Sequence, residues 1–129
     1  MSVGVAYVGC SESGMTTSTH HYHYENGAPI YDDQGNIVGY QQVLVYDPAV
    51  PISGSITTGS SRVLLGGRQV AMIGSKTSES DAYDSGTGTV TGGSSRVLIH
   101  GVGISRNGDI VSPHNGTAHI SSGSSNVLA

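Results

Sequence analysis

Histidine is the residue of this 129-residue chain whose number and spacing most clearly suggest chemistry. Six histidines stand beside only five Lys or Arg residues and nine Asp or Glu residues. Five of the six fall within two polar segments, "STHHYHYEN" and "SPHNGTAHI", as His20, His21, His23, His114 and His119. Imidazole nitrogens bind a metal ion when a fold gathers about four donors around it, and two segments can supply four. The alternative interpretation is that these are solvated histidines on polar loops.

The elements that would position these histidines are set by an internal repeat. Three nine-residue segments are nearly identical: "ITTGSSRVL" from Ile56, "VTGGSSRVL" from Val90 and "ISSGSSNVL" from Ile120. Each alternates apolar and polar residues on both sides of a Gly-Ser bend, which is the period of a strand. The first two copies continue through "GG" or "HG" into a second strand, and such pairs suit tight hairpin turns with positive φ.

The third copy stops at "NVLA", and the start of the chain resembles its missing half. The segment "GVAYVGCSE" (residues 4–12) aligns with "QVAMIGSKT" (residues 69–77). We therefore predict an all-β fold, a small pseudo-threefold cone of short β-hairpin repeats in which the two chain ends complete each other. Residues 10–54, 75–88 and 109–118 would be loops that meet at one end of this body, with the hairpin turns at the other end.

The first of these loops is long enough to hold an insertion, which we place at residues 24–52 of a single domain spanning 1–129. Within it "YDDQGNIVGY" predicts a hairpin of its own, and "QQVLVY" predicts a strand. We interpret the insertion as a β flap, either packed along the body or projecting from it. Its tyrosines would cover a small core of the flap or form a contact surface.

Composition excludes several classes of function. A net charge of −4 with five basic residues gives no basic patch, so a nucleic-acid partner is not expected. No apolar run approaches the roughly 20 residues of a membrane span. The single cysteine excludes an internal disulfide and is compatible with a reducing cytoplasm. Neither a His-Glu-x-x-His nor a Gly-x-Ser-x-Gly signature supports catalysis, so we predict that the chain is not an enzyme.

The repeat resembles that of the PAAR-repeat family, whose units read approximately Gly-Ser-x-x-Val-x-Ile-x-Gly followed by Ala-x-x-Gly-Asp. The segments "RVLLGGRQVAMIGS" and "RVLIHGVGISRNGD" match that unit, and "VAYVGC" matches its tail, with Cys10 where the family usually has Asp. The resemblance covers residues 2–12 and 53–129. It implies a pointed β domain on the blunt end of a trimeric β-helical spike, as in phage tails and type VI secretion systems.

The resemblance also implies one metal ion, typically zinc, held at the tip by loop residues. The ligands expected here are His20, His21, His23 and His114. On a strand His21 and His23 would share one face, and "HNG" at His114 resembles a His-Gly-Gly element of the family. Cys10 could also serve, whereas His119 would point outward beside an inward Ile120. The segment "KTSESDAYDSGTG" offers Glu79, Asp81 and Asp84 as its strong donors.

The predicted function is therefore a spike tip that caps and sharpens a trimeric spike, one copy per trimer, and helps to pierce a target membrane. The docking residues would lie at the turn end: Gly66, Gly67, Arg68, His100 and Gly101. The protein would be cytoplasmic before assembly and would then sit at the tip of a phage tail or secretion particle. Two alternatives are a carbohydrate-binding or adhesive β-module that uses the tyrosine-rich insertion, and a small zinc-dependent hydrolase.

Overall fold

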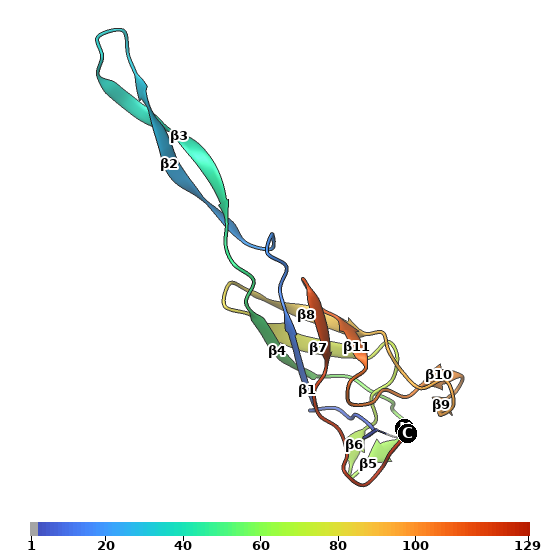
Figure 1. The fold of residues 1–129 in the computed structure, drawn as a ribbon. Coiled ribbons are helices and arrows are strands. Elements are labelled where there is room, and N and C mark those ends of the chain that lie inside the picture. The colour runs from blue at the N-terminus through green and yellow to red at the C-terminus, as the bar shows by residue number, and fades with distance from the viewer. Residues whose placement is uncertain (1–2) are drawn as a thin grey trace. The chain divides into compact units, whose positions relative to one another are not determined.

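A computed structural model describes residues 3–129, which form an all-β fold, as predicted, in two compact units. The barrel unit comprises residues 3–17 and 50–129, and the hairpin unit comprises Ser18–Ala49 (Figure 1). Thr16 and Val50 join the barrel unit at the two ends of the hairpin unit. The Thr16 N–H donates to the Val50 carbonyl (2.9 Å), and the Val50 N–H donates to Thr16 Oγ1 (3.0 Å). None of the described residues forms a helix of the length and apolarity needed to cross a membrane.

The barrel unit is built around a closed sheet of six antiparallel strands in the order β1-β12-β11-β8-β7-β4. Because β1 pairs with both β12 and β4, the barrel leaves no strand edge unpaired. The six strands are β1 (Ser11–Met15), β4 (Pro51–Ile56), β7 (Lys76–Ser80), β8 (Ser85–Val90), β11 (Ile110–Ser112) and β12 (Thr117–Ile120).

Two short ribbons extend this barrel at the predicted turns. They are β5 (Leu64–Leu65) with β6 (Arg68–Gln69), and β9 (Leu98–Ile99) with β10 (Val102–Gly103). Their central residues all have positive φ, as the sequence predicts: Gly66 (59°), Gly67 (84°), His100 (50°) and Gly101 (81°). Where a third turn would stand, Val3 and Ala129 exchange two N–H···O bonds of 3.1 and 2.9 Å. The chain ends therefore complete one ribbon, which confirms that prediction.

A cyclic set of hydrogen bonds establishes the threefold arrangement of the repeat. The Ala6 N–H donates to the Ser105 carbonyl, the Ser105 N–H to the Ala71 carbonyl, and the Ala71 N–H to the Ala6 carbonyl, at 2.9, 2.9 and 3.0 Å. These three positions are equivalent in the three copies. The ring closes on itself, so each copy contacts both of the others through its backbone.

The Gly-Ser-Ser motif recurs because its first serine organises the bend in every copy. The hydroxyl of that serine accepts the N–H groups of residues two and three positions later, at 2.9–3.1 Å in each case. The three serines are Ser60, Ser94 and Ser124. Likewise Cys10 Sγ, Ser75 Oγ and Asp109 Oδ2 each accept the N–H three residues earlier. Cys10 therefore occupies the position that the alignment with Asp109 predicts.

Small aliphatic side chains fill the axis, as the absence of Phe and Trp requires. One buried cluster contains Val5, Val70 and Ile104, one residue from each copy. A second contains another such triple, Ile56, Val90 and Ile120, with Ala6, Ala71 and Cys10 among its other members. Each triple repeats one aliphatic position around the axis, so the interior is narrow.

The prediction that residues 10–54, 75–88 and 109–118 are loops was wrong, because these segments supply the six barrel strands. The reason is that this part of the barrel interior is polar. Glu12, Thr77 and Glu79 are buried and point inward from β1 and β7. Alternation of apolar and polar residues, which marks an ordinary strand, is therefore missing from β1 and β7.

The hairpin unit consists of β2 (Tyr22–Tyr31) and β3 (Ile37–Tyr46), paired antiparallel through the predicted turn. In that turn Asp32 Oδ1 accepts the N–H groups of Gln34 and Asn36, both at 2.9 Å. The unit begins at residue 18 and ends at 49, where the sequence placed the insertion at 24–52. None of residues 18–49, all of which the structure describes, is buried. The tyrosines therefore do not cover a core within the flap.

Candidate functional site

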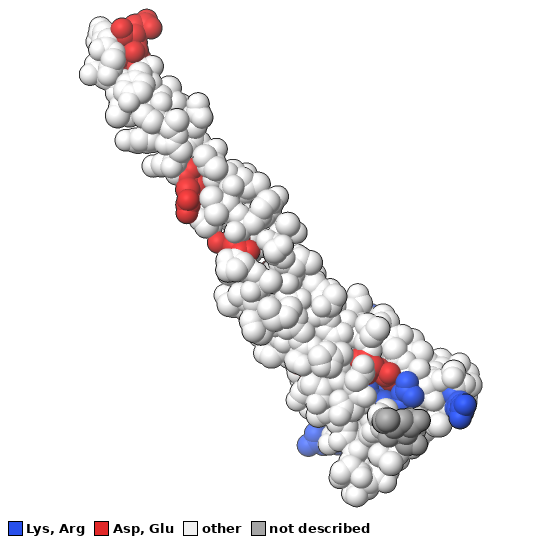
Figure 2. All heavy atoms as spheres, in the orientation of Figure 1, with Lys and Arg blue, Asp and Glu red and all other residues white. Residues whose placement is uncertain are grey.

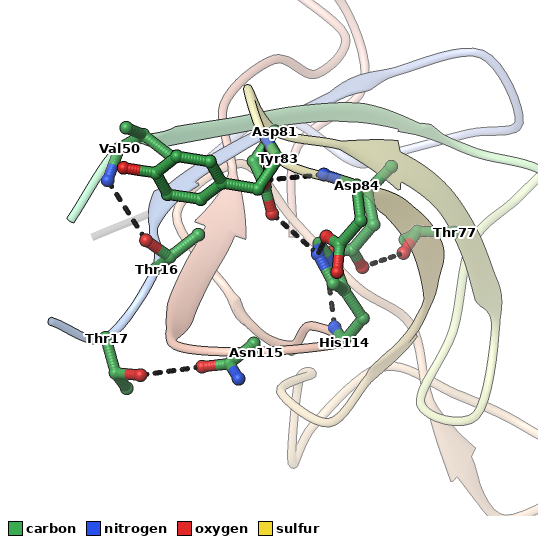
Figure 3. Close-up of polar contacts among 10 residues, drawn as sticks. Thr16, Thr17, Val50, Thr77, Asp81, Tyr83, Asp84, His114 and Asn115 are labelled. Carbon is green, nitrogen blue, oxygen red and sulfur yellow. Dashed lines mark hydrogen bonds and ion pairs between the residues drawn. The ribbon is translucent and has the colours of Figure 1, made fainter. Parts of the chain in front are cut away.

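Three carboxylates surround His114 in the barrel unit, and we call Glu79, Asp81, Asp84 and His114 the His114 cluster. Glu79 lies near the end of β7, Asp81 and Asp84 lie in the turn between β7 and β8, and His114 lies in the turn between β11 and β12. Figure 3 shows Asp81 and Asp84 directed at the imidazole. Two turns of the closed barrel thus bring the cluster together from segments about 30 residues apart in sequence, as hairpin ends in a closed sheet do.

Both ring nitrogens of His114 contact carboxylate oxygens. Nδ1 lies 2.8 Å from Glu79 Oε2, while Nε2 lies 2.8 Å from Asp81 Oδ2 and 2.9 Å from Asp84 Oδ1. The His114 side chain is 12% exposed, and the side chains of Glu79 and Asp81 are fully buried. Asp84 is exposed. The cluster is therefore enclosed by protein except on the side of Asp84.

Local hydrogen bonds position the carboxylates of Asp81 and Glu79. Asp81 Oδ1 accepts the N–H groups of Tyr83 (2.7 Å) and Asp84 (3.0 Å), which locks the turn in place. Thr77 Oγ1 donates to Glu79 Oε1 at 3.2 Å. A Cβ atom at Gly86 would lie 2.6 Å from His114 Cβ, so glycine is needed there for the imidazole to pack against β8.

The electrostatics of the cluster favour a protonated His114 in the metal-free protein. Burial by itself lowers the pKa of His114, but the carboxylates of Glu79, Asp81 and Asp84 outweigh it and raise that pKa above 6.5. Burial also opposes ionisation of Asp81, yet the N–H groups of Tyr83 and Asp84 and the His114 imidazole lower its pKa to about 2. The carboxylates therefore stabilise the imidazolium form of His114.

Glu12 lies inside the same barrel, but unlike the carboxylates of the His114 cluster it makes no hydrogen bond to a histidine in the described structure. It is 1% exposed, and neither of its carboxylate oxygens has a hydrogen-bond partner in the described structure. Burial raises the pKa of Glu12 and repulsion from Glu79 adds to this, while Thr77 and His114 oppose the rise without cancelling it. Glu12 in the folded chain therefore loses its proton at a higher pH than an exposed glutamate does.

Asp81, Asp84 and His114 form a group that could hold a metal ion. One ligand atom from each lies within 4.8 Å of the others. Two carboxylate oxygens and one imidazole nitrogen are donors that zinc and other divalent transition metals accept. A metal on Nε2 would replace the proton there. Glu79, which would accept a hydrogen bond from Nδ1–H, would then orient the ring, as carboxylates do for many metal-binding histidines. The residues present therefore fit a divalent metal.

The other predicted ligands, His20, His21 and His23, belong to the hairpin unit. His21 Nδ1 and His23 Nδ1 contact the two oxygens of Asp47, at 2.5 and 2.8 Å, so the two imidazoles share one side of the hairpin as predicted. His23 Nε2 also lies 2.9 Å from Glu25 Oε1. The hydrogen bond to Glu25, followed by those to Asp47, raises the pKa of His23.

Two further candidate ligands, Cys10 and His119, lie outside the His114 cluster. Cys10 is buried in the apolar cluster, and its Sγ accepts the Tyr7 N–H at 3.4 Å, so it lies in the core and outside the His114 cluster. His119 is exposed beside a fully buried Ile120, as predicted.

The acidic ligands were not in the predicted set. The signal that could have found them is the repeat itself, because it makes the 81–84 and 113–116 turns equivalent hairpin ends.

A second feature of the barrel unit is an apolar surface with one contribution from each copy. We call it the Val–Leu face, and its residues are Val63, Leu64, Val97, Leu98, Val127 and Leu128. Its three leucines are 59%, 51% and 55% exposed. Most of the face lines a hollow of about 310 Å³ whose floor includes Val5, Val70 and Ile104. The predicted docking residues in the two turns are exposed and directly follow Leu65 and Ile99.

No protein-family model matches the sequence, and no curated protein matches it significantly.

Proposed function

We propose that this chain is a spike-tip protein, which caps a trimeric β-helical spike of a contractile injection machine and helps to pierce the target envelope. The observation that carries the proposal is the cyclic hydrogen bonding of Ala6, Ala71 and Ser105. It means that one polypeptide presents three near-equivalent surfaces around one axis. A monomer of that kind can make the same contact with all three subunits of a trimer.

The Val–Leu face is the surface that would dock. Exposed leucines stand at three equivalent positions, and two of them, Leu64 and Leu98, line an apolar hollow together with Val127 of the third copy. Contiguous apolar surface of this kind marks interaction sites. The turn residues Gly66, Gly67, Arg68, His100 and Gly101 would form part of the same interface. One chain would bind per trimer, and the opposite end of the barrel would face the target membrane. The chain would be cytoplasmic until assembly and then become part of the particle.

We further propose that the His114 cluster binds one zinc ion, the metal that the resemblance implies. Asp81, Asp84 and His114 would hold it, and Glu79 would position His114. Zinc would supply a crosslink between the β7–β8 and β11–β12 turns. Such a crosslink suits this end of the barrel because its interior is polar at Glu12, Thr77 and Glu79, so apolar burial contributes little stability there.

The docking proposal is tested by binding to a purified trimeric β-helical spike from the same particle. Leu64→Ser, Leu98→Ser and Leu128→Ser should each weaken binding about tenfold or more, because each removes one of three apolar contacts. Leu44→Ser, at an exposed leucine of the hairpin unit, is the matched control and should bind as the unchanged chain does. Equal binding by all four variants would refute docking through the Val–Leu face.

One observation favours the carbohydrate-binding alternative: the hairpin unit exposes its tyrosines. Tyr22 packs edge-to-face with Tyr24 and Tyr46, at centroid distances of 6.0 and 6.4 Å, and all three are exposed. Aromatic faces of this kind can stack on sugar rings. Glycan-array binding that is abolished by Tyr22→Ala and Tyr46→Ala, with unchanged spike binding, would establish this second activity.

A further inference from the structure

The hairpin unit has no buried core to stabilise it in water. It has only two strands, and none of residues 18–49 is buried. An isolated two-stranded hairpin is at best marginally stable, and stable sheets need a third strand or a covered apolar face. Yet the unit exposes large apolar side chains along its whole length, among them Ile30, Ile37, Val38, Val43 and Leu44. Such a surface is that of an element which another molecule completes.

The free edge of β3 is suited to pairing with another strand. Within the described residues, β3 pairs with β2 alone, so one side of its ten-residue backbone lacks a β partner. Its sequence, "IVGYQQVLVY", contains no charged residue and no proline. Natural proteins protect a solvent-exposed edge with charge, proline or a bulge. In this unit Pro29 and the register shift after Asn26 are in β2. A second register shift, between Ile30 and Tyr31, places the extra residue Val38 near the start of β3, and residues 39–46 of β3 have none of these devices.

Charge indicates what kind of molecule would pair there. The hairpin unit contains four acidic residues and no Lys or Arg, so it carries the whole net charge of −4, whereas the barrel unit has five residues of each sign. Figure 2 shows acidic and no basic side chains on the visible face of the hairpin unit. A second copy of the chain, an anionic lipid surface and a nucleic acid would all be repelled by this charge. A cationic partner would be attracted.

We propose that the hairpin unit is a docking element for a cationic β-sheet protein, whose edge strand adds along β3 and whose Lys and Arg side chains face Asp32 and Asp33. Main-chain hydrogen bonds to β3 would supply affinity, and the apolar side chains would supply specificity, as in other complexes formed by strand addition. The acidic turn would accelerate association. This surface is separate from the Val–Leu face, so the inference does not depend on spike binding.

The test uses the full chain and a ten-residue peptide of alternating Lys and Val. Two matched peptides are needed: the same sequence N-methylated at alternate residues, which lacks half of its N–H donors, and an alternating Glu and Val sequence. We expect the Lys–Val peptide to bind, and both controls to bind about tenfold or more weakly. Amide hydrogen exchange should show new protection in β3. Affinity should fall about tenfold between about 0.05 and 0.5 M NaCl.

Variants of the protein locate the interaction. The double variant Asp32→Asn with Asp33→Asn should weaken the Lys–Val peptide severalfold, whereas Asp109→Asn, an acidic position in the barrel unit, should not. Equal binding of the N-methylated peptide, protection outside β3, or unchanged affinity in the double variant would each overturn the proposal. Binding of the full chain to phosphatidylglycerol vesicles through the hairpin unit would also overturn it. The same holds if light scattering shows a dimer of the full chain and removal of residues 18–49 abolishes that dimer.

Discussion

Each of the two units holds a histidine between carboxylates, and the two settings differ in exposure. In the barrel unit His114 is 12% exposed, and two of its three carboxylate partners are fully buried. In the hairpin unit His23 is 44% exposed and contacts Glu25 and Asp47. The same types of residue are therefore rigidly positioned and poorly solvated in one unit, and solvated in the other. Solvent screening makes exposed ion pairs contribute little to stability, so only the barrel cluster has the properties of a built site.

The difference in exposure follows from how the strands of each unit are paired and packed. The sheet of the barrel is closed. Glycines at positions 14, 54 and 88 allow neighbouring strands to approach so closely that a Cβ atom there would collide. The hairpin has no such closure and no buried residue. The barrel should therefore behave as a stable, cooperative unit, and the hairpin should become ordered with its partner. The following predictions test this contrast, beginning with the largest effect.

A glycine substitution should distinguish the units most strongly. A Cβ atom at Gly14 would lie 2.0 Å from the Thr117 carbonyl oxygen and 2.6 Å from Ala118 Cα, whereas one at Gly39 has no neighbour within 4 Å. We expect Gly14→Ala to lower the free energy of unfolding by about 3 kcal/mol or more. Gly39→Ala should change it by less than about 0.5 kcal/mol. Urea unfolding followed by circular dichroism measures both, and similar effects of the two changes would contradict the contrast.

Zinc should stabilise the barrel through His114. At a zinc concentration about 100 times the Kd, the free energy of unfolding should rise by about 2.7 kcal/mol. His114→Ala and Asp81→Asn should abolish this rise, whereas His23→Ala should retain it. Calorimetry with and without zinc, with metal content measured on the same samples, decides the matter. A rise that survives His114→Ala would show that the metal binds elsewhere.

Replacement of the buried, ionisable Glu12 by a neutral side chain should stabilise the protein. Because its pKa is raised above 4.5 in the folded chain, the contribution of Glu12 is fully favourable below pH 4.5 and is lost as pH rises through the folded value. Glu12→Gln mimics the protonated form. It should increase the free energy of unfolding by about 2 kcal/mol at pH 7 and have little effect near pH 4. Glu25→Gln, at an exposed carboxylate, is the control, and equal gains in both variants would argue against burial as the cause.

In the metal-free protein, His114 should make stability depend on pH. Its pKa is raised from 6.5, so its contribution is fully present below pH 6.5 and is lost as pH rises through the folded value. We expect a loss of about 1 kcal/mol across that window. His114→Asn should flatten the profile, and His119→Asn, at an exposed histidine, should leave it unchanged. A profile that stays steep in His114→Asn would assign the effect to another group.

Removal of the hairpin unit should have the smallest effect on the barrel. The hydrogen bonds between Thr16 and Val50 hold the two ends of this unit together, so a short Gly-Ser linker can replace residues 18–49. The barrel should keep its free energy of unfolding within about 0.5 kcal/mol and its zinc binding within about twofold. Unfolding of the shortened chain would show that the two units depend on each other.

Most of what the sequence could predict about the fold came from the internal repeat. Recurrence of Gly-Ser-Ser at Ser60, Ser94 and Ser124 predicted the threefold arrangement, and the matching half-repeats predicted the joined chain ends. The barrel strands β1 and β7 were missed because inward Glu12, Thr77 and Glu79 remove the apolar alternation. The ligand set was only partly predictable. His114 was predicted from its resemblance to a family element. Asp81 and Asp84 were noted as donors but left out of the ligand set, because the sequence does not mark the pairing of β8 with β11 that brings their turn beside His114.

The central claim is that one chain of threefold repeats caps one trimer. The most direct test is native mass spectrometry of the complex with a purified trimeric β-helical spike, combined with light scattering in solution. The account predicts a single species with one chain per three spike subunits, formed also by the chain that lacks residues 18–49. A complex of three chains per trimer, or no complex with a correctly folded spike, would contradict it.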